Sequence, residues 1–123
     1  MAASVLPVPP VPPGWPAEVP PPGSDDFTAR AVNWLLEKVP TGYRDHGIFR
    51  RWPAALASLA HYHAQALLNG HRQGYRTVRT ELSGKIPPHA VDAVLAAYRV
   101  EGQGHAATAK AIDLVARALF DAS

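Results

Sequence analysis

The stretch SGKIPP at residues 83–88 decides the fold, because it separates two long segments with helical periodicity. Gly84 can end one helix, and Pro87 and Pro88 can begin the next, since proline is favoured in the first turn of a helix and excluded from its interior. The flanking segments predict helices over about 53–83 and 88–121. So short a connection forces the two helices to pack antiparallel. We therefore predict a long antiparallel helical hairpin.

The register of this hairpin follows from the position of its turn. An antiparallel pair that turns near residue 85 brings residues i and j together where i + j is about 171. Val78 then faces Val94, and Tyr98 faces Gly74. Glycine inside a helix costs about 1 kcal/mol relative to alanine, and a ring lying flat against the backbone would explain it. Gly70, one turn away, is predicted to extend the same small-residue groove.

A shorter amphipathic helix is predicted before the hairpin, over about 25–39. Ser24 or Asp25 can cap its first turn, and Pro40 stops it. The chain is 47% hydrophobic but only 8% aromatic, so its interior must consist largely of Ala, Leu and Val, which suits packed helices better than a sheet. The predicted fold class is all-α: a small helical bundle built on the hairpin plus the N-terminal helix.

Residues 1–23 are predicted to form a Pro-rich extended tail or strap, and 24–123 a single helical domain. Nine of the thirteen prolines lie within residues 7–22. Proline fixes its own φ and lacks an amide donor, so this segment favours polyproline-II geometry. Trp15 could anchor it on the helical body. The alternative is a ligand motif, since P-x-x-P spacings overlap between residues 7 and 13.

Several functional classes are excluded or disfavoured by composition. The absence of cysteine removes disulfides, thiolate catalysis and cysteine-ligated zinc. No window approaches 18 consecutive apolar residues and no secretory signal is visible, so we expect a cytoplasmic protein without a membrane span. No phosphate-binding loop or nucleophile motif occurs, so we expect no cofactor and favour a non-enzymatic role. The heavy use of Ala, Pro and Arg is typical of a high-GC bacterial genome.

A second apolar stripe on the first hairpin helix suggests the function. It faces away from the hairpin contact by roughly 100° on the helical wheel. Its members are Ala57, Ala64, Leu68, Tyr75 and Leu82, of which Leu68, Tyr75 and Leu82 are the candidate interaction residues. The short N-terminal helix cannot cover its whole length, so either the Pro-rich strap or a second copy of the protein should cover the remainder. The stripe therefore predicts an interaction or adaptor protein that docks a protein partner or associates with itself, and a homodimer is expected.

Nucleic-acid binding is the second interpretation. Arg72, Arg76 and Arg79 recur at helical spacing and are predicted to share the face opposite the apolar stripes, as a row of phosphate contacts would require. The middle of the chain, residues 41–86, carries a net charge of +5. The same row is also typical of an ordinary solvated helix face, and no nucleic-acid-binding motif accompanies it.

A small enzyme or metal binder is the third interpretation. His63 and His105 are predicted to approach each other across the hairpin, with Glu101 one turn away. Against this stands a structural explanation, in which the three residues form a buried, hydrogen-bonded polar layer that fixes helix register. The six histidines otherwise lack the three- or four-residue spacing of metal ligands on one helix.

Overall fold

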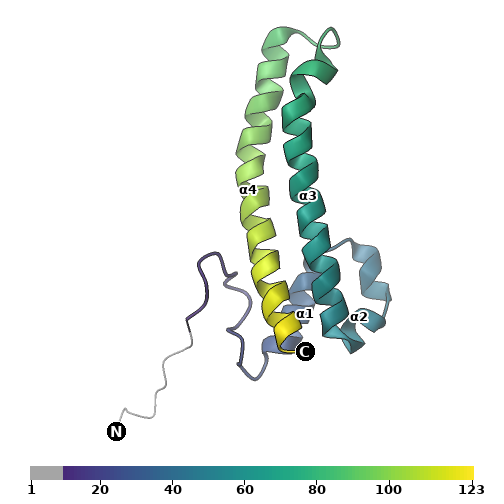
Figure 1. Cartoon of the computed structure of the whole chain (residues 1–123), viewed down its shortest axis with the longest axis vertical. Coiled ribbons are helices and arrows are strands. Elements are labelled where there is room, and N and C mark those ends of the chain that lie inside the picture. Colours follow the sequence, from purple (N-terminus) through teal and green to yellow (C-terminus); the bar gives the residue numbers. More distant parts are fainter. Residues whose placement is uncertain (1–9) are drawn as a thin grey trace.

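A computed structural model describes residues 10–123 of the chain (Figure 1). Its elements are α1 (Phe27–Lys38), the 3₁₀ helix η2 (Thr41–Asp45), α2 (Ile48–Arg51), α3 (Pro53–Leu82) and α4 (Pro88–Asp121). No strand occurs in this range, so the predicted all-α class is confirmed. None of the described helices is both long and apolar enough to traverse a lipid bilayer.

The hairpin dominates the structure. Figure 1 shows α3 and α4 running side by side along the long axis, while the other elements gather at the end opposite the connecting loop, here called the base. The helix bounds agree with the sequence prediction to within one residue. Gly84 ends the first helix with φ +73°, in the left-handed region that favours glycine. Pro88 is the first residue of α4, which continues without a break through its two central glycines.

The predicted register is confirmed at Gly74. A Cβ added there would lie 2.6 Å from the Tyr98 hydroxyl oxygen and 2.9 Å from Cε1, so only glycine admits this ring. A second close approach involves His71, whose Nε2 donates to the Tyr98 carbonyl oxygen at 2.7 Å and would lie 2.7 Å from a Cβ on Gly102. The prediction for Gly70 was wrong, because a Cβ there would meet nothing within 4 Å.

These two glycines make a matched pair of stability predictions. Gly70→Ala should raise the free energy of unfolding by about 0.5–1 kcal/mol, because the site is open and alanine is the better helix former. Gly74→Ala should lower it by about 1–2 kcal/mol, because the new methyl group displaces the Tyr98 ring. Urea denaturation of both variants tests this. Equal changes in the free energy of unfolding of the two variants would contradict the close packing of Tyr98 on Gly74.

Two separate apolar cores stabilise the hairpin. The base core joins buried residues of α1, α3 and α4. The distal core, near the loop, consists of Val78, Val91 and Leu95, with partly buried neighbours. Between them lies the mid-hairpin, residues 65–77 and 96–108, which contains no buried residue. Gly74 and Gly102 face the neighbouring helix at this level, and no third element within residues 10–123 covers it.

α1 closes the base core, because it contacts both α3 and α4. It begins at Phe27, two residues later than predicted, and Asp26 is its N-cap without a side-chain capping bond. Neither Ser24 nor Asp25 provides the expected cap; the Ser24 backbone oxygen instead accepts from the Phe27 amide at 3.1 Å. The side chain of Asp26 lies 3.7 Å from Arg30, one turn into the helix.

The described part of the Pro-rich segment, residues 10–23, lies against the base. Trp15 donates from Nε1 to the Val19 carbonyl oxygen at 2.8 Å, and its ring centroid lies 6.2 Å from that of Phe27. Val19 is buried in the base core. Trp15 therefore anchors this part as a strap. Pro7 and Pro9, which begin two of the P-x-x-P spacings, lie outside the described residues.

Candidate functional site

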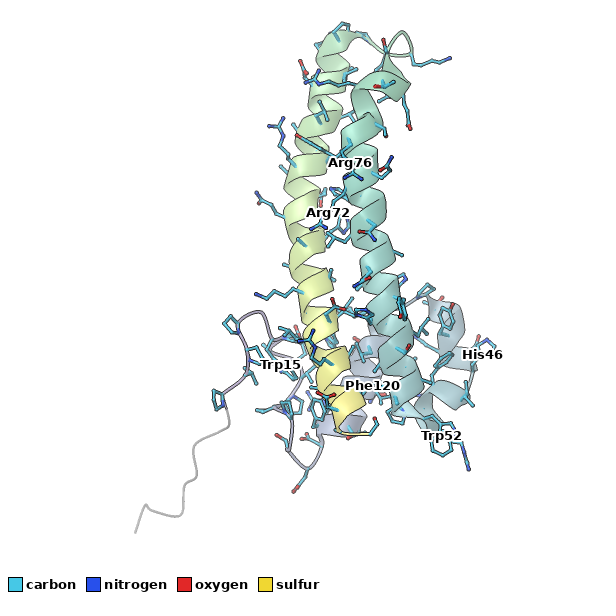
Figure 2. All side chains as sticks on the ribbon, in the orientation of Figure 1. Trp15, His46, Trp52, Arg72, Arg76 and Phe120 are labelled. Atoms are coloured by element: carbon cyan, nitrogen blue, oxygen red, sulfur yellow. The ribbon has the colours of Figure 1, made fainter. Side chains whose placement is uncertain are left out.

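A hollow of about 610 Å³ lies on one side of the mid-hairpin. Leu68, Tyr75 and Tyr98 supply apolar surface to it, and Arg72, Arg76 and Arg99 are its charged members. Figure 2 shows Arg72 and Arg76 at mid-height of the hairpin, far from the base. This central hollow therefore combines exposed aromatic surface with positive charge.

The two tyrosine rings of the central hollow pack against other residues of the hairpin. Tyr98 is fixed between Gly74 and His71, with ring centroids of His71 and Tyr98 4.9 Å apart. Tyr75 packs edge-on against Tyr98 at 6.5 Å and is still 38% exposed. Because more than a third of the Tyr75 side chain is exposed, its ring offers apolar surface that a partner could cover.

Within the part of the chain that the structure describes, the arginines of the central hollow have no acidic partner. The three ion pairs formed within residues 10–123 are Arg30–Asp26, His61–Asp113 and Arg79–Asp92. Arg76 donates to the Gln73 side-chain oxygen at 2.7 Å, which leaves its charge uncompensated. Three guanidinium groups around one apolar hollow attract a carboxylate from another molecule.

A second hollow, of about 240 Å³, lies at the base. Inside it His61 Nδ1 donates to Asp113 Oδ1 at 2.9 Å, a pair that links α3 to α4 and remains partly exposed. Tyr62 and Phe120 line the same hollow and are 66% and 57% exposed. Figure 2 shows Phe120 at the base end of the hairpin. The base hollow thus carries two carboxylates, one arginine and two open aromatic rings.

A third hollow, of about 440 Å³, lies near the loop. Ile86, Pro88 and Val91 give it an apolar lining. Arg79 and Asp92 border it and form an ion pair at 3.2 Å. Because both side chains are largely exposed, this pair contributes little to stability.

The three hollows lie on one face of the hairpin, here called the groove face. Their lining residues recur at intervals of three or four along each helix, which places them on a common side. On α3 this set includes Ser58, His61, Leu68, Arg72, Tyr75, Arg79 and Ser83, and on α4 it includes Val91, Asp92, Arg99, Ala106, Asp113, Arg117 and Phe120.

The structure divides the predicted apolar stripe. Leu82 is half-buried against the distal core, and Leu68 is half-buried against the base core. Tyr75 is the most exposed of the three. The structure also divides the predicted basic row, because Arg79 lines the hollow near the loop and is paired with Asp92. Arg72 and Arg76 line the central hollow beside Leu68 and Tyr75, so the prediction that the basic row lies opposite the apolar stripe was wrong.

The predicted histidine layer is not buried. Glu101 and His105 are exposed and His63 is half-buried, and no polar or charged residue among residues 10–123 is fully buried. The ring of His105 lies 5.0 Å from that of His71. Over the same residues, no cluster of three or more His, Asp or Glu side chains is arranged to hold a metal ion.

The His61–Asp113 pair is the feature that the sequence interpretation missed. Its residue numbers sum close to the value predicted for facing positions, so the register rule could have found it.

No family model matches this chain, and no curated protein or solved structure matches it either.

Proposed function

We propose that this protein is a non-enzymatic helical interaction protein that docks another protein chain through its groove face. The observation that supports this most directly is the mid-hairpin, where no residue is buried and Leu68, Tyr75 and Tyr98 line an open hollow. Covering apolar surface is favourable by about 25 cal/mol per Å², so a partner that covers these rings gains binding free energy.

The shape of the hairpin favours a helical partner. Two antiparallel helices form half of a four-helix bundle, and a further helix or helix pair would complete a core at the mid-hairpin. The unpaired charges of Arg72, Arg76 and Arg99 would set the orientation of the partner, because charge complementarity governs orientation and partner choice more than affinity.

Site-specific photo-crosslinking in the native cell tests this proposal. A photoreactive residue at Gln103, which lines the central hollow, should give protein adducts. The control is Ala107, which is equally classed as exposed and lies on α4 but outside the hollow. Crosslinking to protein from position 103 and not from position 107 is the expected result. Equal yields from both positions, or no protein adduct from position 103, would contradict the proposal.

Nucleic-acid binding is the second candidate function, and one observation favours it. The central hollow combines two tyrosine rings with three arginines, and single-stranded nucleic acids bind to surfaces of aromatic and basic residues. If this function holds, affinity for an oligonucleotide should fall steeply with salt and be lost in the triple variant Arg72→Glu, Arg76→Glu, Arg99→Glu. Binding that is absent or insensitive to salt would rule it out.

A further inference from the structure

We infer that the groove face docks on the groove face of a second copy of this chain, with the two hairpins antiparallel and Ala106 beside the two-fold axis. This inference rests on the proposed function and names the partner. Three features support it: the three hollows, the unpaired arginines and the open aromatic rings.

Charge selects the antiparallel arrangement over the parallel one. The contact of Gly74 with Tyr98 places Arg72 on a level with residue 100, next to Arg99. A parallel dimer with aligned ends would therefore set Arg72 of one copy beside Arg99 of the other, with no carboxylate of the central hollow between them. Like charges at such close range are destabilising. Reversing one hairpin moves the arginines of each copy toward the base of the other.

An axis at Ala106 brings opposite charges together. Arg99 lies seven residues before Ala106 on α4 and Asp113 seven residues after it, so a two-fold axis there sets Arg99 of each copy against Asp113 of the other. Asp113 Oδ1 accepts from His61, and a carboxylate can accept further hydrogen bonds at its second oxygen. The symmetry produces this ion pair twice.

The same axis places the exposed rings of Phe120 and Tyr75 over hollows of the other copy. Phe120 lies fourteen residues beyond Ala106, on a level with Asp92 of the other copy, where Val91 lines the hollow near the loop. On α3, by the register of the hairpin, Tyr75 comes level with Ala57 of the other copy, inside the base hollow. Each ring thus meets a concave surface, as complementary interfaces require.

The available area suffices for a stable dimer. α3 has 30 residues, which corresponds to a length of about 45 Å at 1.5 Å per residue. Two helices side by side are about 20 Å wide, so the groove face could bury about 900 Å² per copy. Specific protein interfaces typically bury about 800 Å² on each partner.

Single cysteines test the position of the axis, because the chain has no cysteine of its own. Ala106→Cys should form a disulfide-linked dimer under mild oxidation, since residues beside the axis can approach within the Cα separation of about 4.4–6.8 Å that a disulfide needs. Ala107→Cys is the matched control; it too is exposed, but it points about 100° away on the helix. Equal disulfide yields in the two variants would overturn the inference.

Charge reversal tests the antiparallel ion pair. Analytical ultracentrifugation of Arg99→Asp and of Asp113→Arg should show dimer dissociation constants raised by about tenfold or more. The double variant should recover dimerisation, because the reversed pair forms across the same interface. Circular dichroism of each variant checks that the helices are intact. Failure of the double variant to recover would overturn the inference.

The outcomes separate this inference from the proposed function. A purified protein that stays monomeric at high micromolar concentration overturns the homodimer. If position 103 still crosslinks to another protein in the cell, docking through the groove face stands and only the identity of the partner is wrong. If position 103 crosslinks to nucleic acid alone, both the homodimer and the proposed protein docking fail.

Discussion

Replacing Leu35 with alanine should lower the free energy of unfolding by about 3–5 kcal/mol. Leu35 is completely buried, and it belongs to α1, which contacts both hairpin helices. The substitution removes apolar area and leaves a cavity that three packed helices cannot close. Urea denaturation followed by far-ultraviolet circular dichroism measures the change, and an unchanged dependence on urea concentration would show that only stability is affected.

The control for Leu35 is the same substitution in the distal core. Leu95 is buried against only two other buried side chains, Val78 and Val91. Because this small cluster lies between two helices and borders solvent, Leu95→Ala should cost about 2 kcal/mol, near the lower end of the range for such changes. Equal losses at the two positions would contradict the division of the structure into a large base core and a small distal core.

The hairpin was predictable because local chemistry determines it. Proline can begin a helix and cannot continue one, and glycine can adopt the left-handed conformation that ends one, so the bounds of α3 and α4 follow from Pro53, Gly84 and Pro88. The register followed from the length of the loop. At Gly74 the close approach of Tyr98 also explains a glycine that helix propensity alone disfavours.

The candidate site was less predictable, because exposure depends on how the helices are covered. The sequence predicts Leu82 as part of an uncovered stripe, but the loop folds back so that Ile86 packs on the same distal core. A helical wheel cannot represent that contact. The wheel also cannot show that His105 lies in the mid-hairpin, where no third element covers the two helices and the side chains remain accessible to water.

The groove face itself was also beyond the sequence, although its residues were visible. Tyr75, Arg72 and Arg76 were each identified from spacing, in separate stripes with separate proposed roles. The structure places all three in one hollow with Arg99 of the other helix. To place them in one hollow, one must know how each helix is rotated about its own axis. Side-chain packing determines that rotation, and sequence periodicity predicts it only approximately.

Replacing Phe27 with alanine should cost about 3–5 kcal/mol and release the strap as well. Phe27 is 2% exposed, at the first residue of α1, and its ring lies beside that of Trp15. Losing the ring removes the surface on which Trp15 rests, and Trp15 in turn holds Val19 through its hydrogen bond. One substitution should therefore weaken both the base core and the attachment of residues 10–23.

Two measurements separate these effects. Urea denaturation reports the loss of stability, and limited proteolysis under native conditions reports cleavage within the strap. Val11→Ala serves as the control, because Val11 lies in the same strap and is 38% exposed. This substitution should change neither the free energy of unfolding nor the rate of cleavage within the strap. A Phe27→Ala variant that is destabilised but keeps its strap resistant to protease would show that Val19 alone holds the segment. The hydrogen bond and ring contact of Trp15 make the opposite result the expected one.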